Sequence, residues 1–343
     1  MPDRKRFEES MRVLVTGAAG FIGSAVSSSL KQAGHEVLGV DSFSDYYSVH
    51  LKKKRVTHFF DNQSIILDEV DISNYDEISK SIKRFKPDSV VNLAAQAGVR
   101  LQVSDFGKYI ESNINGFTNI ARASIENGVK NFMYASSSSV YGNSASTPYS
   151  ESEESLHPTS YYGATKRFNE LVVPTMFMNS DVRVRGLRFF TVYGPWGRPD
   201  MAYFRMIANL YAGTPFQLFG NGEIERDFTF IDDVSSAVMD LLVELSNRKP
   251  GFNDCVNIGG GRPLSMNYLT QVISDLAGRK LEIERRPGMR EDTARTMSNP
   301  SYLIELIGKK PETKLEDGIL KTLAWARDEV FKEELGTWAT SSK

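Results

Sequence analysis

Short apolar runs alternate along the first half of the chain with segments whose apolar residues recur at helical spacing. Arg12-Val-Leu-Val-Thr16 is a β-branched run that stops at a glycine, and residues 20–33 then follow a helical period up to Gly34. The same reading predicts strands at 36–41, 64–69, 88–93, 131–136 and 182–188 and helices at 76–84, 108–127 and 161–177. This alternation predicts an α/β fold, a doubly wound parallel sheet with helices on both faces.

The pattern changes after residue 190. The chain becomes richer in glycine and proline, with shorter helices predicted near 201–212, 232–247, 267–277 and 315–331. We expect this part to form a smaller lobe of mixed α/β structure. The predicted organisation is a disordered leader at 1–10, a first domain at 11–190, and a second domain mainly at 191–343, from which some segments return to the first.

Composition and charge narrow the class of protein. The 343 residues carry 41 Lys and Arg against 43 Asp and Glu, a net charge of −2, so no basic field favours nucleic acid as a partner. A single cysteine, Cys255, cannot form an internal disulfide, and the four histidines lack metal-ligand spacing, so we expect no metal. The charged start of the chain and the lack of a long apolar stretch predict no signal peptide and no membrane span. We therefore expect a soluble cytoplasmic protein.

A glycine-rich turn follows the first predicted strand. Thr16-Gly-Ala-Ala-Gly-Phe-Ile-Gly23 precedes a helix, so its backbone can approach a pyrophosphate whose charge the helix N-terminus stabilises. Asp41 ends the next strand 18 residues after Gly23 (41 − 23), where a carboxylate accepts ribose hydroxyls and repels a 2′-phosphate. This context predicts a Rossmann-type domain that binds NAD rather than NADP. The predicted contacts are Gly17, Gly20, Phe21, Ile22, Gly23 and Asp41.

Two nearby features allow more than one interpretation. The basic run at 52–55 could bind a 2′-phosphate, but we interpret it as one solvated face of a helix. Asp71 and Ile72, at the end of the third predicted strand, could hydrogen-bond the adenine amine of NAD. The alternative for Asp71 is a helix N-cap at a strand exit.

Tyr162 and Lys166 lie four positions apart (166 − 162) in the helix predicted over 161–177, so their side chains share one face. An adjacent ammonium and an oxidised nicotinamide would lower the tyrosine pKa from about 10 by roughly 1 to 3 units, giving a base near neutral pH. Such a pair also occurs on ordinary exposed helices. The serines at 136–139 favour a catalytic interpretation of this pair. They lie at the end of the fifth predicted strand, at the edge where doubly wound sheets bind ligands.

At these residues the chain resembles the extended short-chain dehydrogenase/reductases and, within them, the nucleotide-sugar 4-epimerases. The resemblance rests on TGAAGFIG (16–23), Asp41, NLAAQAGVR (92–100), SSSSVYG (136–142), YGATK (162–166) and RDFTFIDDV (226–234). It implies that Tyr162 is the base, that Lys166 supports it and holds the NAD ribose, and that Ser137 bonds the reacting sugar oxygen. The further NAD contacts that it implies are Ala94 and Ala95.

The stretch RFFTVYGPWGRPDMA at 188–202 is similar to the UDP-glucuronate 4-epimerases in particular. UDP-glucose epimerases typically carry asparagine where Thr191 stands. Arg198 offers a planar fork for a sugar carboxylate, although an arginine in such a loop also pairs readily with a local acid such as Asp200. The resemblance implies these further UDP-sugar contacts: Ser138, Ser139, Thr191, Phe219, Arg226, Arg290 and Asp292. The segment GMRED at 288–292 departs from the family pattern, which puts the last two in doubt.

The resemblance implies an NAD-dependent 4-epimerase that interconverts UDP-glucuronate and UDP-galacturonate through a 4-keto intermediate. A UDP-glucose or UDP-N-acetylglucosamine 4-epimerase remains an alternative. A decarboxylase or dehydratase would be expected to carry a carboxylate in the loop where this chain has Ser137-Ser138-Ser139. A non-catalytic NAD-binding regulator would usually lack the Tyr/Lys pair. The resemblance also suggests a homodimer formed by the helices near 108–127 and 161–177.

Overall fold

The computed structural model describes residues 10–98, 103–143, 146–288 and 293–327 and divides the chain into two compact units. The first unit comprises the chain up to Ser137 together with Tyr161–Arg188 and Ser235–Val256. The second comprises Ser138–Ser160, Phe189–Val234 and the chain from Asn257 onward. Each unit is built from several segments that are far apart in sequence.

The main sheet has seven strands in the order β10-β6-β5-β4-β1-β2-β3. Their bounds are β1 Arg12–Thr16, β2 Glu36–Asp41, β3 Ile66–Glu69, β4 Ser89–Asn92, β5 Asn131–Ser137, β6 Arg183–Phe189 and β10 Asn253–Ile258. The printed pairings of β1 with β2 and β4, of β2 with β3 and of β4 with β5 are parallel. The order 3-2-1-4-5-6 within this sheet is that of a Rossmann fold, so the predicted fold class is confirmed.

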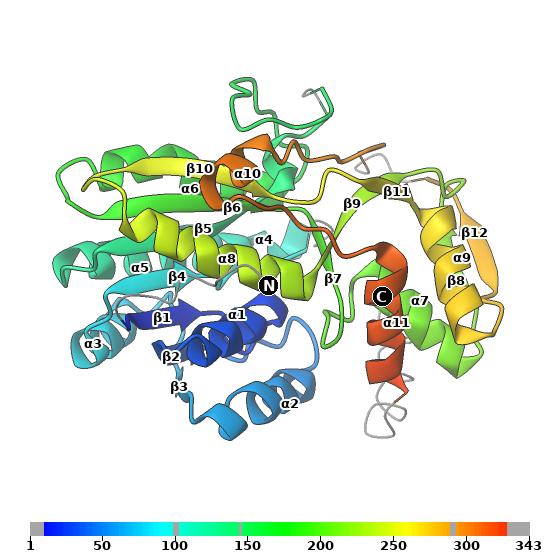
Figure 1. The fold of residues 1–343 in the computed structure, drawn as a ribbon, viewed down its shortest axis with the longest axis horizontal. Coiled ribbons are helices and arrows are strands. Elements are labelled where there is room, and N and C mark those ends of the chain that lie inside the picture. The colour runs from blue at the N-terminus through cyan, green and yellow to red at the C-terminus, as the bar shows by residue number, and fades with distance from the viewer. Residues whose placement is uncertain (1–9, 99–102, 144–145, 289–292, 328–343) are drawn as a thin grey trace. The chain divides into compact units, whose positions relative to one another are not determined.

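Helices cover both faces of this sheet (Figure 1). Their bounds are α1 Phe21–Gln32, α2 Val49–Phe59, α3 Tyr75–Phe85, α4 Phe106–Tyr109, α5 Phe117–Glu126, α6 Tyr161–Met176 and α8 Ile231–Ser246. One face packs against α3, α5 and α6 through a core that includes Leu14, Val90 and Phe132 from the strands. Figure 1 shows α1 and α8 in front of the sheet. Burial of each such side chain contributes about 1.5–3 kcal/mol, so the sheet is a rigid platform for the loops at its edge.

Three elements of the first unit differ from the sequence prediction. The helix predicted over 108–127 is interrupted by a π-helical segment, η3 (Ile110–Gly116), between α4 and α5. Strand β10 was not predicted, and α2 was expected only as the helix that carries the basic run at 52–55. A helical period in the sequence does not distinguish a π-helical segment from an α-helix. Turns of this kind frequently mark functional sites. Short 3₁₀ helices are η1 Asp61–Gln63, η2 Val103–Asp105 and η4 Ser138–Val140.

In its described residues, the second unit has two small sheets and the four α-helices given below. Strands β7 (Thr191–Tyr193), β9 (Glu225–Phe230) and β11 (Pro263–Ser265) form one sheet in the order β11-β9-β7. The other sheet pairs β8 (Phe216–Phe219) with β12 (Ile283–Arg286). The helices are α7 Ala202–Ala212, α9 Met266–Ala277, α10 Ser301–Ile307 and α11 Leu315–Ala326.

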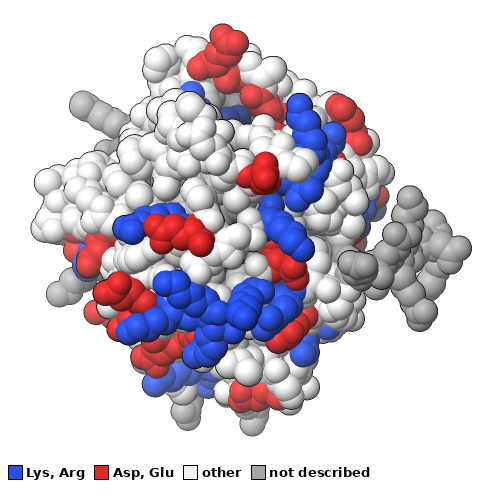
Figure 2. Space-filling view, turned by 90° about the vertical axis from the view of Figure 1, so that its left-hand side faces the viewer, with Lys and Arg blue, Asp and Glu red and all other residues white. Residues whose placement is uncertain are grey.

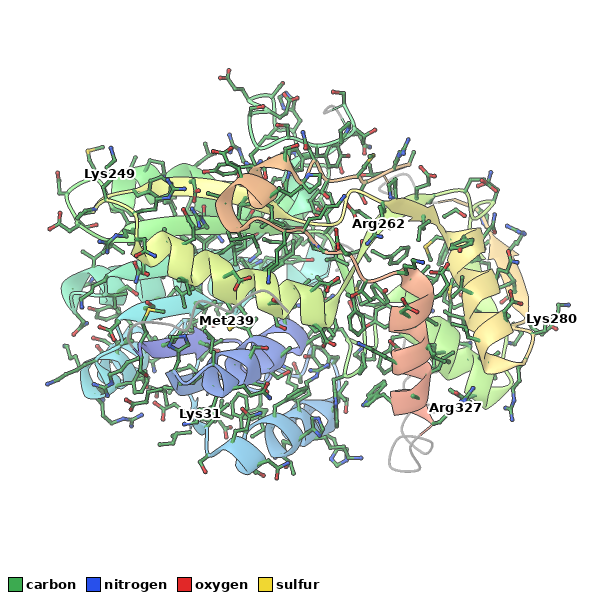
Figure 3. The ribbon with its side chains drawn as sticks, in the orientation of Figure 1. Lys31, Met239, Lys249, Arg262, Lys280 and Arg327 are labelled. Atoms are coloured by element: carbon green, nitrogen blue, oxygen red, sulfur yellow. The ribbon has the colours of Figure 1, made fainter. Side chains whose placement is uncertain are left out.

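Side chains tie the loops of the second unit to its strands. The fully buried Asp227 of β9 accepts hydrogen bonds from the backbone N–H groups of Gly260 (3.2 Å) and Gly261 (3.0 Å) and from the Ser298 hydroxyl (2.6 Å). Arg262, labelled in Figure 3, donates to the carbonyls of Pro311 and Thr313 ahead of α11. The first set of bonds satisfies the buried Asp227 carboxylate, and both sets hold irregular backbone in one conformation.

Candidate active site

The C-terminal ends of the parallel strands carry most of the residues predicted to bind the cofactor. Gly17 follows β1, Asp41 ends β2, Ala94 and Ala95 follow β4, and Ser137 ends β5. Because parallel strands end at the same edge of a sheet, these positions lie along one edge of the first unit. Thr16 and Asn92, at the ends of β1 and β4, are joined by a hydrogen bond of 2.5 Å between their side chains. The Thr16 hydroxyl oxygen also accepts from the backbone N–H of Ala94 (3.2 Å).

The glycine positions of the turn after β1 have no room for a side chain. Gly17 has a φ of +67°, and a Cβ there would lie 2.7 Å from the backbone nitrogen of Ala94. A Cβ on Gly23 would lie 2.0 Å from the Gly17 carbonyl oxygen. Gly20 occupies the N-cap position of α1, with no side-chain capping bond. An uncapped helix N-terminus behind a turn of bare backbone fits a pyrophosphate.

Asp41 connects this turn to the next strand. One oxygen of its nearly buried carboxylate accepts from the backbone N–H of Ala19 (3.0 Å), and the other from that of Phe43 (2.8 Å). The Lys52 ammonium lies 4.0 Å from the same carboxylate. A carboxylate has about four lone-pair directions, so two backbone bonds leave acceptor capacity for ribose hydroxyls.

The interpretation of residues 52–55 as a solvated helix face is wrong for two of its members. Lys52 is 5% exposed and Arg55 is 0% exposed. Arg55 donates to the Tyr47 hydroxyl (2.6 Å) and to the carbonyl of Ala19 in the glycine turn (3.2 Å). Burial lowers the pKa of Lys52, and the nearby Asp41 carboxylate partly opposes that shift. The inward half of this run therefore supports the glycine turn, which a charge count along the sequence cannot show.

Asp71 and Ile72 have different surroundings. The exposed Asp71 accepts from the backbone N–H of Ser73 (2.8 Å), whereas the Ile72 side chain belongs to the core of the first unit. The N-cap of α3 is Asn74, whose side chain accepts from the Glu77 N–H (3.3 Å). The alternative that Asp71 caps this helix is therefore wrong, and its bond to adenine stays a prediction.

Tyr162 and Lys166 lie in the first turns of α6. The Lys166 ammonium is 5.7 Å from the centre of the Tyr162 ring, so the predicted pair on one helix face is present. Lys166 is only 2% exposed, and this burial lowers its pKa to about 8. A positive charge held at this short range, with little water to screen it, favours the phenolate form of a neighbouring tyrosine. Ser137, the third predicted catalytic residue, is 8% exposed at the end of β5.

Asn113, which lies in the π-helical segment, was not among the predicted site residues. Its side chain accepts from the Gln96 N–H (2.8 Å) and donates to the Gln96 carbonyl (3.1 Å) and the Thr165 hydroxyl (3.0 Å). The Asn169 amide, oriented with its nitrogen toward them, donates to the carbonyls of Asn113 (2.9 Å) and Thr165 (3.3 Å). Asn113 thus joins the loop after β4 to the helix that carries Tyr162 and Lys166. An asparagine inside a predicted helix was the available signal, because asparagine disfavours helix interiors.

The residues predicted to bind the sugar nucleotide lie in the second unit. Ser138 and Ser139 form η4, Thr191 begins β7 and Phe219 ends β8, and all four side chains are partly exposed. Arg198 donates from Nε to one oxygen of Asp200 (3.0 Å), and Nη2 pairs with the other (2.5 Å). The structure therefore confirms the alternative, in which Arg198 pairs with the local acid Asp200.

The remaining predicted phosphate ligands differ in how they are held. Arg226 of β9 donates from Nη1 to the carbonyls of Glu225 (2.9 Å) and Thr293 (2.7 Å). Both of these acceptors are backbone carbonyls. Arg290 and Asp292 lie outside the described residues.

The described part of the chain has neither a membrane-spanning helix nor a cluster of candidate metal ligands. None of its helices is both long and apolar enough to cross a membrane. Within the same residues, no cluster of three or more His, Cys, Asp or Glu side chains is placed to hold a metal ion. The face drawn in Figure 2 carries Lys and Arg side chains next to Asp and Glu, as expected for a chain with a net charge of −2.

Comparison with known proteins gives consistent matches. The model of the NAD dependent epimerase/dehydratase family matches residues 13–259. The chain is 40% identical to Protein CapI of Staphylococcus aureus over 331 residues, 92% of this chain and 98% of that protein. It is 35% identical over 318 residues to UDP-glucuronate 4-epimerase of Thermodesulfobacterium geofontis, 92% of this chain and 96% of that protein. UDP-glucuronic acid 4-epimerase from Bacillus cereus, solved with UDP-glucuronic acid and NAD, superposes with a TM-score of 0.83 and 31% identity, covering 92% and 98% of the two chains.

Proposed function

Because the chain belongs to the NAD dependent epimerase/dehydratase family, we propose that it is a UDP-glucuronate 4-epimerase, which interconverts UDP-glucuronate and UDP-galacturonate. The observation that carries the proposal is the Tyr162–Lys166 pair on one face of α6, in a unit whose glycine turn suits a dinucleotide. The names of the Thermodesulfobacterium and Bacillus proteins support this choice of sugar.

The first unit fits NAD. Gly17, Gly20 and Gly23 would hold the pyrophosphate against α1, and Asp41 would accept the adenosine ribose hydroxyls. Lys166 would donate to the nicotinamide ribose. The further contacts that we propose are Phe21, Ile22, Asp71, Ile72, Ala94 and Ala95. Bound NAD supplies the hydride acceptor and donor for C4 of the sugar, so the reaction consumes no net oxidant.

Tyr162 is the acid and base of the proposed reaction. It removes the proton of the sugar 4-hydroxyl as C4 is oxidised to a ketone, and it returns that proton when the ketone is reduced from the opposite face. The buried Lys166 ammonium stabilises the phenolate that this role requires. Ser137 hydrogen-bonds the 4-oxygen and holds it toward Tyr162. Between the two half-reactions the 4-keto sugar turns over about its pyrophosphate link.

The second unit supplies recognition of the UDP-sugar. We propose that Arg198 binds the sugar carboxylate, helped by hydroxyl donors from Ser138, Ser139 and Thr191. Since Asp200 already holds the Arg198 guanidinium, the sugar carboxylate must compete with it or share the guanidinium with it. The nucleotide contacts that we propose are Phe219 beside uracil and Arg226, Arg290 and Asp292 along the diphosphate and ribose.

We also propose an oligomeric state and a cellular location for the protein. Ile110 of η3 and Leu171 of α6 are 42% and 58% exposed, on the two helical segments expected to form the dimer. Burying such side chains against a second copy would remove apolar surface from water. We therefore propose a homodimer through a four-helix bundle, working in the reducing cytoplasm.

The test is to incubate the purified protein, without added NAD, with UDP-glucuronate, UDP-glucose or UDP-N-acetylglucosamine, and to identify the products by proton NMR. The proposal predicts UDP-galacturonate from UDP-glucuronate and no comparable turnover of the two neutral sugars. Epimerisation of a neutral sugar instead would remove Arg198 from its role and leave the Tyr162 mechanism intact. UDP-xylose or a stable 4-keto product would make the protein a decarboxylase or a dehydrogenase.

A further inference from the structure

A buried carboxylate connects the strand that carries Ser137 to the helix that carries Tyr162 and Lys166. Glu170 of α6 has a side chain that is 2% exposed. Its Oε1 accepts from the Ser136 hydroxyl of β5 (2.7 Å) and from Nε of Arg188 (2.8 Å). Its Oε2 accepts from Nη2 of Arg188 (3.0 Å) and from Arg167 (3.1 Å). The bidentate pair with Arg188 fixes the orientation of the carboxylate plane.

The Glu170 carboxylate lies close in sequence or structure both to Ser137 and to the Tyr162–Lys166 pair. Ser136 is the residue directly before Ser137, and Glu170 lies four positions after Lys166 (170 − 166), one turn along the same face of α6. A shift of Ser136 relative to Glu170 would therefore move the Ser137 hydroxyl relative to the helix that carries Tyr162 and Lys166. A change of about 1 Å in such a placement is enough to lower a rate 10²-fold.

We propose that Glu170 is a positioning residue for the reaction: its bonds to Ser136 and Arg188 set the distance between Ser137 and the Tyr162–Lys166 pair. This inference rests on the proposed function, because it assigns Ser137 to the reacting oxygen. The network touches neither substrate nor cofactor in the roles given above. Its expected effect is on the chemical step and not on binding.

The same strand provides a matched control. Arg185 and Arg188 are three positions apart on β6 and so point to opposite faces of the sheet. Arg185 is also fully buried and also bidentate, to Asp254 of β10 (2.7 and 2.8 Å), with a further bond to Glu244 of α8. Its partners have no role in the proposed site. Buried ion pairs can often be replaced by apolar side chains of similar volume without loss of stability. Both networks can therefore be removed in the same way.

The first experiment is a double-mutant cycle with Ser136→Ala and Ser137→Ala. The single change Ser136→Ala leaves the Glu170–Arg188 pair intact, so the protein should fold and retain its bound NAD. We expect kcat per bound NAD to fall about tenfold with an unchanged KM for UDP-glucuronate, and we expect no further fall when Ser136→Ala is added to Ser137→Ala. Independent losses that multiply in the double variant would overturn the proposal, as would a wild-type kcat in Ser136→Ala.

The second experiment compares two paired replacements, E170M/R188M and R185M/D254M. We expect the first to lower kcat per bound NAD about 10²-fold and the second to leave it unchanged, whatever each does to the melting temperature. Equal kcat values in the two variants would overturn the positioning role. Failure of the proposed function is distinguishable, because the wild-type protein would then not convert UDP-glucuronate; the same comparison is then made on the sugar that it does convert.

Discussion

The predicted cofactor residues and the predicted substrate residues are held in different ways. In the first unit the glycine turn is constrained by its own backbone, since a Cβ at Gly17 or Gly23 would collide with backbone atoms. In the second unit the predicted ligands are side chains with partners of their own, Arg198 on Asp200 and Arg226 on two carbonyls. Backbone sterics therefore fix the first arrangement, whereas the side chains of the second can exchange one partner for another.

This difference predicts which substitutions should affect all sugars and which should affect only one class of sugar. A change at the first unit's edge should affect every sugar, because it alters the cofactor or the base that all 4-oxidations share. A change at Arg198 should affect one class of sugar, because only a carboxylate needs a guanidinium. Specificity can therefore vary within this fold without loss of the chemistry.

The largest expected effect is at Tyr162. Tyr162→Phe removes the phenolate oxygen that we propose accepts the sugar proton and keeps the ring, so kcat should fall roughly 10²–10⁴-fold. The loss should be the same for any sugar that the wild-type protein converts. The measurement is product formation by NMR, with bound NAD quantified after denaturation. A variant that retains both its NAD and its wild-type rate would show that Tyr162 is not the base.

Arg198→Met should cause the next largest loss of activity, and the size of that loss should depend on the sugar. Losing a charge-assisted bond of about 1.5–3 kcal/mol lowers kcat/KM for UDP-glucuronate by about 10–10²-fold. A neutral UDP-sugar should be unaffected or used slightly better. An equal loss on charged and neutral sugars would place Arg198 outside carboxylate recognition.

Asp200→Asn is the opposing change in the same pair. It releases the Arg198 guanidinium from a partly exposed ion pair, a type that contributes about 0.2–1 kcal/mol. The dissociation constant for UDP-glucuronate should therefore fall by up to about fivefold, as measured by calorimetry. Weaker binding would indicate that Asp200 holds Arg198 in place for the sugar and does not compete with it.

Gly23→Ala tests the steric constraint in the first unit. Its Cβ would lie 2.0 Å from the Gly17 carbonyl oxygen, so the turn must deform at a cost of about 1–3 kcal/mol. We expect purified variant protein to carry about tenfold less NAD per chain. Gly107→Ala in α4 is the control, because a Cβ there meets nothing within 4 Å, and it should keep its NAD. Equal NAD content in the two variants would show that the turn tolerates a side chain.

The remaining expected effect is on stability and not on activity, and it is a pH dependence that originates at Lys166. Burial lowers its pKa to about 8, whereas the unfolded chain keeps a value of about 10.4. Between these values the unfolded state binds more protons, so the stability of nucleotide-free protein gains about 1 kcal/mol per pH unit from this group as pH rises. Urea unfolding at pH 8.5 and 9.5 should show this gain in the wild type relative to Lys166→Met. Parallel curves would mean that the ammonium is not desolvated.

Most of the first unit could be predicted from the sequence, because the features that define it depend on residues close together in the chain. The glycine turn, Asp41 and the Tyr162–Lys166 spacing each follow from backbone sterics or helix periodicity. The inward side of the basic run and the contacts of Asn113 were missed, because both depend on segments that are distant in sequence. For Arg198 the sequence allowed two partners, and only the structure could show that Asp200 is one of them. The roles of these residues stay predictions.

The central claim is that C4 is oxidised and then reduced by the same bound NAD. UDP-glucuronate carrying deuterium at C4 tests it most directly, with the product examined by mass spectrometry and proton NMR. The account predicts UDP-galacturonate that retains the deuterium fully at C4, without added NAD. Loss of the deuterium to water would contradict it, because the configuration would then be inverted by removing a proton from carbon and not by returning a hydride.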